Sequence, residues 1–275
     1  MDIATIAGLI LALTTLVVVL IMDGGSPAEL FAAPSAIILI IGGSMGATII
    51  TSPLKTVLKL PQFIMQAFTT RNFDAKETIE LLTKLADKAR REGLLALEED
   101  SKKIPDAFLK KGIMMVVDGV DPEQVAAIME TTVEQMRARH KQGIGFFTAA
   151  GGFAPTFGII GTVMGLINVL KQLDNPSALG EAIAAAFLAT LWGLLTANLI
   201  YLPIGGKLKS KSEEEARNRY MQLEGILSIQ AGENPRIVRD KLSAFLPPSE
   251  IVSEEDAGKA PVKKVAAGKA EKAQA

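Results

Sequence analysis

The chain has 275 residues, of which 49% are hydrophobic, and its mean hydropathy is +0.30. The absence of cysteine excludes disulfides and thiol catalysis, and the single histidine argues against serine–histidine hydrolase triads and histidine-rich metal sites. The formal net charge of −1 is uninformative, because charges crowd some segments and are missing from others. Uncharged runs of about 20 residues or more predict an all-α integral membrane protein.

The first span is predicted over residues 3–22, whose only polar side chains are threonines. A signal peptide would need basic residues before its apolar run, but only Met1 and Asp2 precede this one. We therefore expect a retained transmembrane helix of about the length that a bilayer requires.

A Gly-Gly-Ser-Pro break at residues 24–27 separates this helix from a second predicted span, residues 30–51. Gly42 and Gly46 form a small-xxx-small pair in this second span. Such a pair lets two helix backbones approach closely, so a tight helix contact is expected there. Residues 1–52 are thus predicted to contain two membrane helices.

Residues 53–142 are polar and charged and predict a compact helical domain. Asp74 begins a capping box (Asp-x-x-Glu), the start signal of a helix that should end near Gly93. Asp121 followed by Pro122 is another helix start. The helix that follows can continue into the next span, and the expected helices cover residues 75–91, 94–103, 108–117 and 122–141.

The third predicted span is an uncharged run over residues 143–170. Pro155 and Thr162 lie seven residues apart in it, which places them on one helix face, two turns from each other. The fourth span is predicted over residues 182–204, after a short loop. Residues 143–205 therefore form a second membrane unit.

The fourth span carries a stripe of small residues at helical spacing: Ala182, Ala186, Ala189, Gly193 and Ala197. Such a stripe is typical of tight helix packing, but a polar lumen lined by Thr162 and Thr190 fits the same pattern. The two hydroxyls could also bond to backbone carbonyls of their own helices. The residues alone leave these alternatives open.

The last part of the sequence is a charged segment followed by a tail. Residues 206–248 are predicted to form helices, with interruptions at Gly232 and Pro235. Residues 249–275 are rich in Ala, Lys, Glu and Gly and have almost nothing to bury, so a disordered tail is predicted.

Basic residues predict the orientation of the spans, because cytoplasmic loops carry an excess of Lys and Arg. Residues 52–142 contain fifteen and the segment after residue 204 contains thirteen. Residues 23–33 contain none, and residues 171–179 contain one. Both large segments and both termini are therefore expected in the cytoplasm, and the two short loops are expected outside.

No Asp, Glu, Lys or Arg lies inside any of the four predicted spans. Proton and cation pathways through lipid usually include an ionisable group near the middle of the membrane. If this chain takes part in ion conduction, the carboxylate must come from another protein.

Charged residues crowd two stretches of the cytoplasmic domain, residues 84–92 and 98–100. A solvated helical hairpin with weak ion pairs explains them, and so does a two-signed face that docks another protein. His140 lies near the base of the third span and is expected to be a solvated residue.

Four stretches carry a resemblance to a known family: residues 89–98 (ARREGLLALE), 117–119 (VDG), 154–165 (APTFGIIGTVMG) and 189–193 (ATLWG). Together with the order of two spans, a cytoplasmic domain, two spans and a tail, they are similar to the flagellar motor stator subunits of the MotA family. This family includes PomA and belongs to the MotA/TolQ/ExbB superfamily. The resemblance covers residues 1 to about 246.

The resemblance implies a stator subunit of the bacterial inner membrane that forms a homopentameric ring around two copies of a MotB-like single-span subunit. The partner's membrane carboxylate would carry the ion, and proton or sodium flow would turn the ring. The cytoplasmic face of the ring would then push on the rotor protein FliG. The chain would also contact membrane lipid. No enzymatic activity, cofactor, metal site or nucleic-acid partner is implied beyond the transported H⁺ or Na⁺.

By match to the family's motifs, the resemblance assigns to the ion pathway Pro155, Thr162, Thr190, Phe187 and Pro203. Arg90 and Glu98 match the charged pair that engages the rotor. The glycines of the third span are expected to pack between ring neighbours; they are Gly158, Gly161 and Gly165.

Two alternatives remain at this point. An ExbB- or TolQ-like energiser of envelope processes belongs to the same superfamily, but those relatives have three spans and an external N-terminus. A passive membrane scaffold would conduct no ions, and the hydroxyls of Thr162 and Thr190 would then be dispensable.

Overall fold

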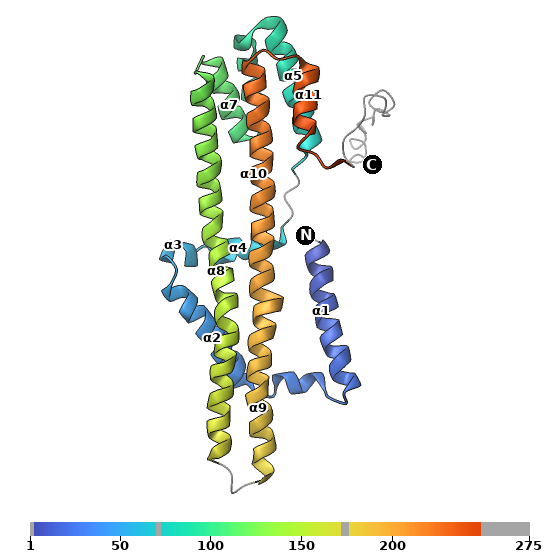
Figure 1. The fold of residues 1–275 in the computed structure, drawn as a ribbon, viewed down its shortest axis with the longest axis vertical. Coiled ribbons are helices and arrows are strands. Elements are labelled where there is room, and N and C mark those ends of the chain that lie inside the picture. Colours follow the sequence, from blue (N-terminus) through green and yellow to red (C-terminus); the bar gives the residue numbers. More distant parts are fainter. Residues whose placement is uncertain (1–2, 70–72, 172–175, 249–275) are drawn as a thin grey trace, which may run out of the picture.

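The computed structural model describes residues 3–69, 73–171 and 176–248, and every regular element in these ranges is a helix. Two long antiparallel rods dominate the molecule, with a helical domain at one end of them (Figure 1). The prediction of an all-α chain with long apolar helices is confirmed for this part of the sequence. The predicted tail, residues 249–275, lies outside the described ranges.

The first rod is the single helix α8, Pro122–Leu170, whose 49 residues extend about 74 Å at 1.5 Å per residue. Asp121 caps its N-terminus by accepting a hydrogen bond of 3.0 Å from the backbone N–H of Glu123, as the sequence predicts. The helix does not end near Lys141 but continues through the third predicted span. One continuous helix therefore joins the helical domain to the apolar run of residues 143–170.

The second rod consists of three consecutive helical elements. They are α9 (Pro176–Leu195), the π-helix η3 (Thr196–Tyr201) and α10 (Leu202–Gln230). The sequence predicts a membrane helix followed by a cytoplasmic helix but gives no sign of the π-turn between them. This rod lies beside α8 along most of its length (Figure 1).

The first two apolar helices flank these rods. Helix α1 (Ile3–Met22) matches the first predicted span. Helix α2 is Pro34–Ile50, so the predicted start of the second span at residue 30 is wrong. Ser26 and Pro27 instead begin the short 3-10 helix η1 (Pro27–Phe31), and Pro34 then occupies the first turn of a new helix.

Three described helices are long and apolar enough to cross a membrane, and their apolar segments lie in α1, α8 and the α9–α10 rod. Helix α2 is apolar but shorter, at 17 residues or about 26 Å. This length lies at the lower end of the range for a transmembrane helix.

The two rods approach at the level of their backbones. A Cβ added to Gly158 would lie 3.0 Å from the carbonyl oxygen of Ala189, and one added to Gly193 would lie 2.9 Å from that of Ala154. The prediction that the α8 glycines pack between ring neighbours is therefore wrong, because they pack against α9 of the same chain. Packing is confirmed as a role of the small-residue stripe.

The glycine of α2 that makes a close helix contact is not one of the two that were predicted. Added Cβ atoms at Gly42 and Gly46 would meet nothing within 4 Å among the described residues. Gly43, between them, is the residue that touches α8, where its missing side chain leaves room for the ring of Phe157. The small-xxx-small pair thus has no close contact within this chain.

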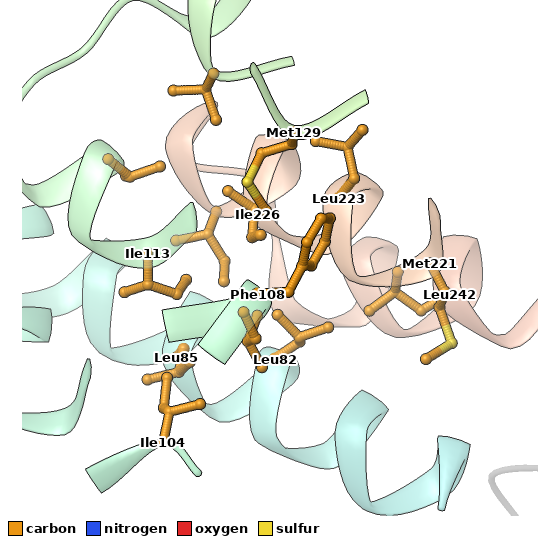
Figure 2. Close-up of a cluster of buried hydrophobic side chains, with 14 of the residues drawn as sticks. Leu82, Leu85, Ile104, Phe108, Ile113, Met129, Met221, Leu223, Ile226 and Leu242 are labelled. Atoms are coloured by element: carbon orange, nitrogen blue, oxygen red, sulfur yellow. The ribbon is translucent and has the colours of Figure 1, made fainter. Parts of the chain in front are cut away.

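The helical domain is built from segments that come before and after residues 143–205 in the sequence. Its core includes Leu82, Met129, Ile226 and Leu242, which are all 0% exposed (Figure 2). They come from α5, α8, α10 and α11 respectively. The helices that complete the domain are α5 (Ala75–Glu92), η2 (Leu94–Leu97), α6 (Glu98–Lys103), α7 (Ala107–Val117) and α11 (Pro235–Ser243).

Local start and stop signals of this domain are confirmed. Asp74 accepts a hydrogen bond of 3.1 Å from the N–H of Glu77, and Gly93 ends α5 with a φ of 85°. Gly232 has a φ of 68° at the break before α11. The predicted helix over residues 94–103 is instead a 3-10 turn followed by a short α-helix.

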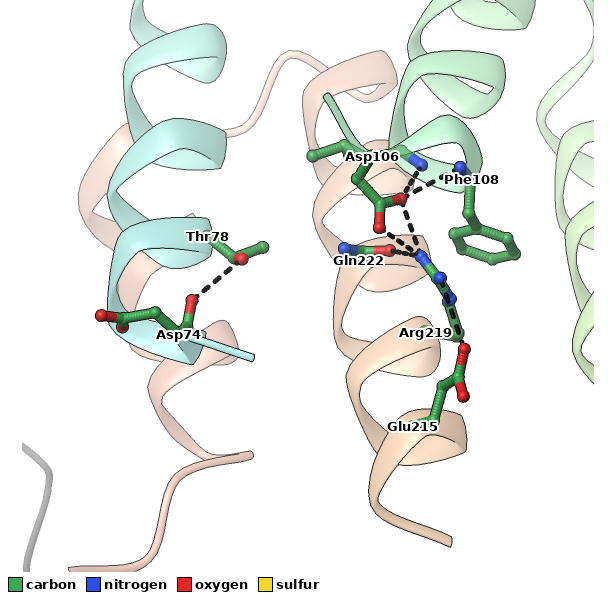
Figure 3. A network of polar contacts seen from close by, with 8 residues as sticks. Asp74, Thr78, Asp106, Phe108, Glu215, Arg219 and Gln222 are labelled. Carbon is green, nitrogen blue, oxygen red and sulfur yellow. Dashed lines mark hydrogen bonds and ion pairs between the residues drawn. The ribbon is translucent and has the colours of Figure 1, made fainter. Parts of the chain in front are cut away.

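An ion pair fixes α7 against α10 (Figure 3). Asp106 caps α7 through the N–H groups of Phe108 and Leu109, and both of its carboxylate oxygens lie 2.7 Å from Nη1 of Arg219. The guanidinium also lies 5.0 Å from the centre of the Phe108 ring. Burial alone would raise the pKa of Asp106, but the Arg219 guanidinium and the two N–H donors outweigh it and lower that pKa.

Replacement of Asp106 by Asn should lower the free energy of unfolding by about 2 kcal/mol, because it removes the carboxylate that lies 2.7 Å from a mostly buried guanidinium and leaves it only that of Glu215, at 3.6 Å. Denaturant unfolding of the purified full-length chain, followed by circular dichroism, measures this loss. Asp87→Asn is the control, since Asp87 makes only an exposed ion pair with Arg91.

The wild type and the Asp106→Asn variant also test the lowered pKa of Asp106. Ionised Asp106 stabilises the fold above its ordinary pKa of 3.8, and this contribution is lost as the pH falls through the lowered folded-state value. The stability difference between the wild type and Asp106→Asn should therefore shrink at acid pH. A difference independent of pH would contradict the assignment.

Candidate functional site

Two hydroxyl groups meet at the contact between α8 and α9. Oγ1 of Thr162 lies 2.5 Å from Oγ1 of Thr190, and it also lies 2.9 Å from the carbonyl oxygen of Ala186 on α9. The carbonyl oxygen of Gly158, one turn earlier on α8, is 3.1 Å away. Both threonine side chains are half-buried. The structure thus brings together two residues predicted for the ion pathway.

This oxygen cluster is a neutral polar site in an apolar surrounding. A hydroxyl has one proton to donate and two lone pairs that accept, so Thr162 can bond to only one of the two carbonyls at a time. The remaining oxygen lone pairs can accept from Thr190, from water or from a hydrated proton, and they can coordinate a hard cation such as Na⁺. The alternative of a hydroxyl bonded to a carbonyl of its own helix is thus seen for Thr162, and the polar lumen stays a prediction.

Pro155 lies inside α8, seven residues before Thr162. Proline has no N–H, so the carbonyl oxygen of Gly151 lacks its usual partner in the helix. Gly151 itself is buried against the side chain of Leu202, the neighbour of Pro203. Because the rods are antiparallel, Pro155 lies about 6 Å from this level in one direction and Pro203 about 1.5 Å in the other, so the two prolines are offset along the rods.

Pro203 explains part of the π-turn that precedes it. Its missing N–H removes the α-helical partner of the Leu199 carbonyl, and Leu199 lies within η3. A π-turn is a common way to accommodate such a defect in a helix and is frequent at functional sites. At 1.5 Å per residue, Pro155 lies about 10 Å along α8 from Thr162, and Pro203 lies about 20 Å along the second rod from Thr190.

Phe187 does not take part in either group. Its ring is 64% exposed, whereas its neighbours Ala186 and Ala189 are buried in the seam between the rods. It lies outside that seam together with other exposed apolar side chains of the two rods, namely Ile159, Ile160, Val163, Met164 and Ile183. These apolar side chains are left uncovered by the other residues that the structure describes.

A second polar cluster was missed by sequence reasoning. Ser44 of α2 is fully buried, and its Oγ lies 3.3 Å from Oη of Tyr201 at the end of η3. Thr48, also fully buried, donates a hydrogen bond of 2.7 Å to the Ser44 carbonyl. The available sequence signal is the four-residue spacing of Ser44 and Thr48, which places both hydroxyls on one face of α2.

No Asp, Glu, Lys or Arg lies among residues 143–170 or 182–204, and no group of three potential metal ligands occurs in the described residues. The polar atoms of the seam are hydroxyls and backbone carbonyls. Such a site can line a path for an ion but cannot carry a proton through by ionising.

Arg90 and Glu98 lie near each other in the sequence but do not form an ion pair in the structure. Arg90, in the last turn of α5, is exposed and lines an open depression of about 630 Å³ with Arg91 and Arg236. Glu98 is 58% exposed and pairs with Lys102 at 3.0 Å. Both charges remain at the surface, where a partner can reach them.

A different ion pair links α5 to α6. Lys88 of α5 and Asp100 of α6 form an ion pair of 2.7 Å. The hydrogen bond from Lys88 lowers the pKa of Asp100. This pair holds the turn between α5 and α6, so Arg90 and Glu98 are not required for it.

His140 is not the solvated residue that the sequence suggested. It is half-buried, and its Nδ1 lies 3.0 Å from Oγ of Ser212 on α10. The expectation was wrong because it considered α8 alone, whereas α10 covers this side of the helix.

Comparison with known proteins agrees with this geometry. The model of the MotA/TolQ/ExbB proton channel family matches residues 100–221, and the model described as motility protein A N-terminal matches residues 6–93. Motility protein A of Bacillus subtilis is 40% identical over 261 residues, which are 94% of this chain and 96% of the relative.

Solved structures extend the likeness to three dimensions. A chain of the C. jejuni MotAB structure matches with a TM-score of 0.88 at 33% identity, over 92% of this chain and 100% of that one. A chain of the flagellar MotAB stator complex from Bacillus subtilis matches with a TM-score of 0.85 at 40% identity, over 90% and 97%. This chain therefore belongs to the motility protein A group of the MotA/TolQ/ExbB proton channel family.

Proposed function

We propose that this chain is the stator subunit of a bacterial flagellar motor, which couples ion flow to rotation together with a MotB-like partner. The observation that carries the proposal is the match to motility protein A and to MotAB stator structures over almost the whole chain. The site is compatible with it, because hydroxyls do not ionise near neutral pH, so a carboxylate from a second protein would carry the ion past them. MotAB complexes are the structural neighbours, which supports a MotB-like partner.

The proposed topology has four spans in the inner membrane, with both termini and the helical domain in the cytoplasm. The distribution of basic residues supports it, with fifteen in residues 52–142 and one in residues 171–179. Helix α2 would serve as the shortest span, which a local thinning of the bilayer accommodates at modest cost.

The proposed assembly is a ring of five around two partner helices. Exposed apolar side chains on both rods, including Phe187, supply a surface that subunits and a partner helix can cover. The ring would conduct H⁺ or Na⁺ past Thr162 and Thr190, with the ion carried by the partner's carboxylate. One elementary charge that crosses 100 mV releases about 2.3 kcal/mol, enough to bias a small rotation between equivalent positions.

The output would be a rigid-body step of the ring. Because α8 is continuous from the membrane seam to the core of the helical domain, a rotation of one moves the other. Arg90 and Glu98 would then transmit torque to the rotor protein FliG. Their exposure and lack of a mutual ion pair support this role.

An ExbB- or TolQ-like energiser is less well supported. The match of residues 6–93 to the motility protein A N-terminal model covers both of the first two apolar helices. Three-span relatives with an external N-terminus would conflict with the basic-residue pattern. A passive scaffold conducts no ions, and the first experiment below distinguishes it.

Thr162→Ala and Thr190→Ala should each slow swimming and partner-dependent ion flux about fivefold, the effect of losing one hydrogen bond of about 1 kcal/mol to the passing ion. Thr162→Ser should keep most of the flux, since it retains the hydroxyl. Thr156→Ala is the matched control, because Thr156 is exposed and bonds only to the Phe153 carbonyl of its own helix. Unchanged flux in both alanine variants would support the scaffold.

Arg90→Glu or Glu98→Lys should reduce torque, measured as the rotation speed of tethered cells, while the amount of complex with the MotB-like partner stays constant. Glu99→Lys is a control of the same charge change, at a neighbour that is 77% exposed. Loss of the complex would instead show that these charges stabilise the subunit.

A reporter fused before Met1 and one fused after residue 248 should both report a cytoplasmic location. A reporter inserted at Gly24, in the loop between α1 and η1, should report the outside. An external N-terminus would contradict the four-span topology and favour the three-span relatives.

A further inference from the structure

Two short helices cross the rods at about their mid-height, and sequence reasoning did not anticipate them. They are α3 (Leu54–Val57) and α4 (Leu60–Phe68), which follow α2 and run across α8 and α10 (Figure 1). Neither is long enough to span a bilayer. Their place and surface point to another role.

Three contacts hold the pair of helices against the rods. Thr56 donates a hydrogen bond of 3.4 Å to Oε1 of Gln142, and the ring of Phe63 packs on Gly143, where an added Cβ would lie 3.0 Å from it. Nζ of Lys211 caps the end of α4 by donating to three carbonyl oxygens, those of Gln66, Ala67 and Thr69, at 2.7, 2.9 and 2.6 Å. The position of α4 is therefore fixed on both rods.

These contacts lie where the rods change from apolar to charged. On α8, Gln142 and Gly143 mark the start of the uncharged run to residue 170. On the second rod the uncharged run from residue 182 ends at Gly206, and Lys211 lies in the first charged turns that follow. With the rods in a bilayer, α4 lies at the level of the lipid headgroups.

The surface of α4 has three distinct sides, because successive residues point 100° apart around a helix. Leu60, Phe63 and Ala67 face the rods, and Ala67 is 1% exposed. On the second side, Ile64 and Met65 are 42% and 65% exposed. The third side is polar and carries Gln62 and Gln66. An apolar side and a polar side that are both exposed are typical of a helix that lies in a membrane interface.

Helix α3 and the turn after it also expose apolar side chains next to polar ones, which here are charged. Leu54 and Leu58 are 71% and 73% exposed, and each is followed directly by a lysine, Lys55 or Lys59. Neither ammonium group has an ion-pair partner among the described residues. Apolar side chains beside cations without an ion-pair partner fit a bilayer surface, where acyl chains lie beneath anionic headgroups.

We propose that α3 and α4 dock on the anionic headgroup layer of the membrane. Leu54, Leu58, Ile64 and Met65 enter the boundary of the acyl chains, and Lys55 and Lys59 bind lipid phosphates. A neighbouring copy of this chain would have to supply both an apolar pocket and acidic groups at this level, whereas a lipid surface supplies both. The inference rests on the proposed membrane placement of the rods.

The absence of cysteine makes the chain a direct background for single-cysteine labelling. Full-length protein with Leu58→Cys or Met65→Cys is labelled with a fluorophore and reconstituted with its MotB-like partner in vesicles of phosphatidylcholine and phosphatidylglycerol. A quencher on shallow lipid positions should reduce the fluorescence of both labels more than a water-soluble quencher does. Labels at Gln62→Cys and Gln66→Cys, on the polar side of α4, should show the reverse order.

A label at Leu11→Cys on α1, where the side chain is 69% exposed, reports separately on the membrane placement. Lipid quenching at Leu11 with only aqueous quenching at Leu58 and Met65 would overturn this inference and leave the proposed topology intact. Protection of Leu58 and Met65 from both quenchers would show a protein contact and also overturn it. No lipid quenching at any of the three would instead contradict the membrane placement itself.

The role of charge is tested by the lipids that remain bound after purification. From mixed vesicles, the wild type should retain several-fold more phosphatidylglycerol relative to phosphatidylcholine than the Lys55→Glu/Lys59→Glu variant, as measured by mass spectrometry. Lys110→Glu/Lys111→Glu on α7 is the control with the same charge change, away from this level, and should match the wild type. Equal retention by all three proteins would overturn the assignment of the lysines to lipid phosphates.

Discussion

The contact between the backbones of α8 and α9 is the constraint on which the rest of the structure depends. Gly158 and Gly193 have no side chain where the two helices cross, and an added Cβ on either would lie about 3 Å from the facing backbone. Only this close approach allows Thr162 to reach both Thr190 and the Ala186 carbonyl on the other rod. Lipid gives no hydrophobic drive for two apolar helices to associate, so close packing and hydrogen bonds must stabilise the pair. The hydroxyl cluster is thus a consequence of the glycine seam and also part of what holds it.

The seam has mechanical consequences because both rods leave the membrane segment without a hinge loop. Helix α8 runs from the seam into the core around Met129, and α10 runs into the same core through Ile226. The Asp106–Arg219 ion pair then fixes α7 on α10. The irregularities described above are Pro155 within α8 and the π-turn before Pro203, and neither breaks the rod in which it lies. A device that transmits small rotations benefits from such continuity.

Features that depend on a few neighbouring residues could be predicted from the sequence. The caps at Asp74 and Asp121 and the helix stop at Gly93 follow from local backbone chemistry, and the first apolar helix follows from composition alone. Features that depend on distant partners could not be predicted. The start of α2 depends on η1, whose end is held on α9 by the hydrogen bond from Trp192 to the Leu30 carbonyl and by the contact between the Phe31 and Trp192 rings. For the site, spacing placed Pro155 and Thr162 on one face, but it did not reveal that the glycines between them pack against α9 of the same chain.

The polar groups of the apolar segments suggest which part of an ion site this chain supplies and which part its proposed partner supplies. The hydroxyls of Thr162, Thr190, Ser44 and Thr48 all have oxygen partners within the chain, so none demands an ion for its own satisfaction. The paired hydroxyls carry no charge that could offset the cost of removing water from a cation. A carboxylate from a second protein would change this balance as it passes, since it supplies the missing charge beside oxygens already in place. The subunit would then supply an uncharged apolar surface with one polar site, the hydroxyls of Thr162 and Thr190. The ion would be bound there only while the partner's carboxylate lies beside these hydroxyls.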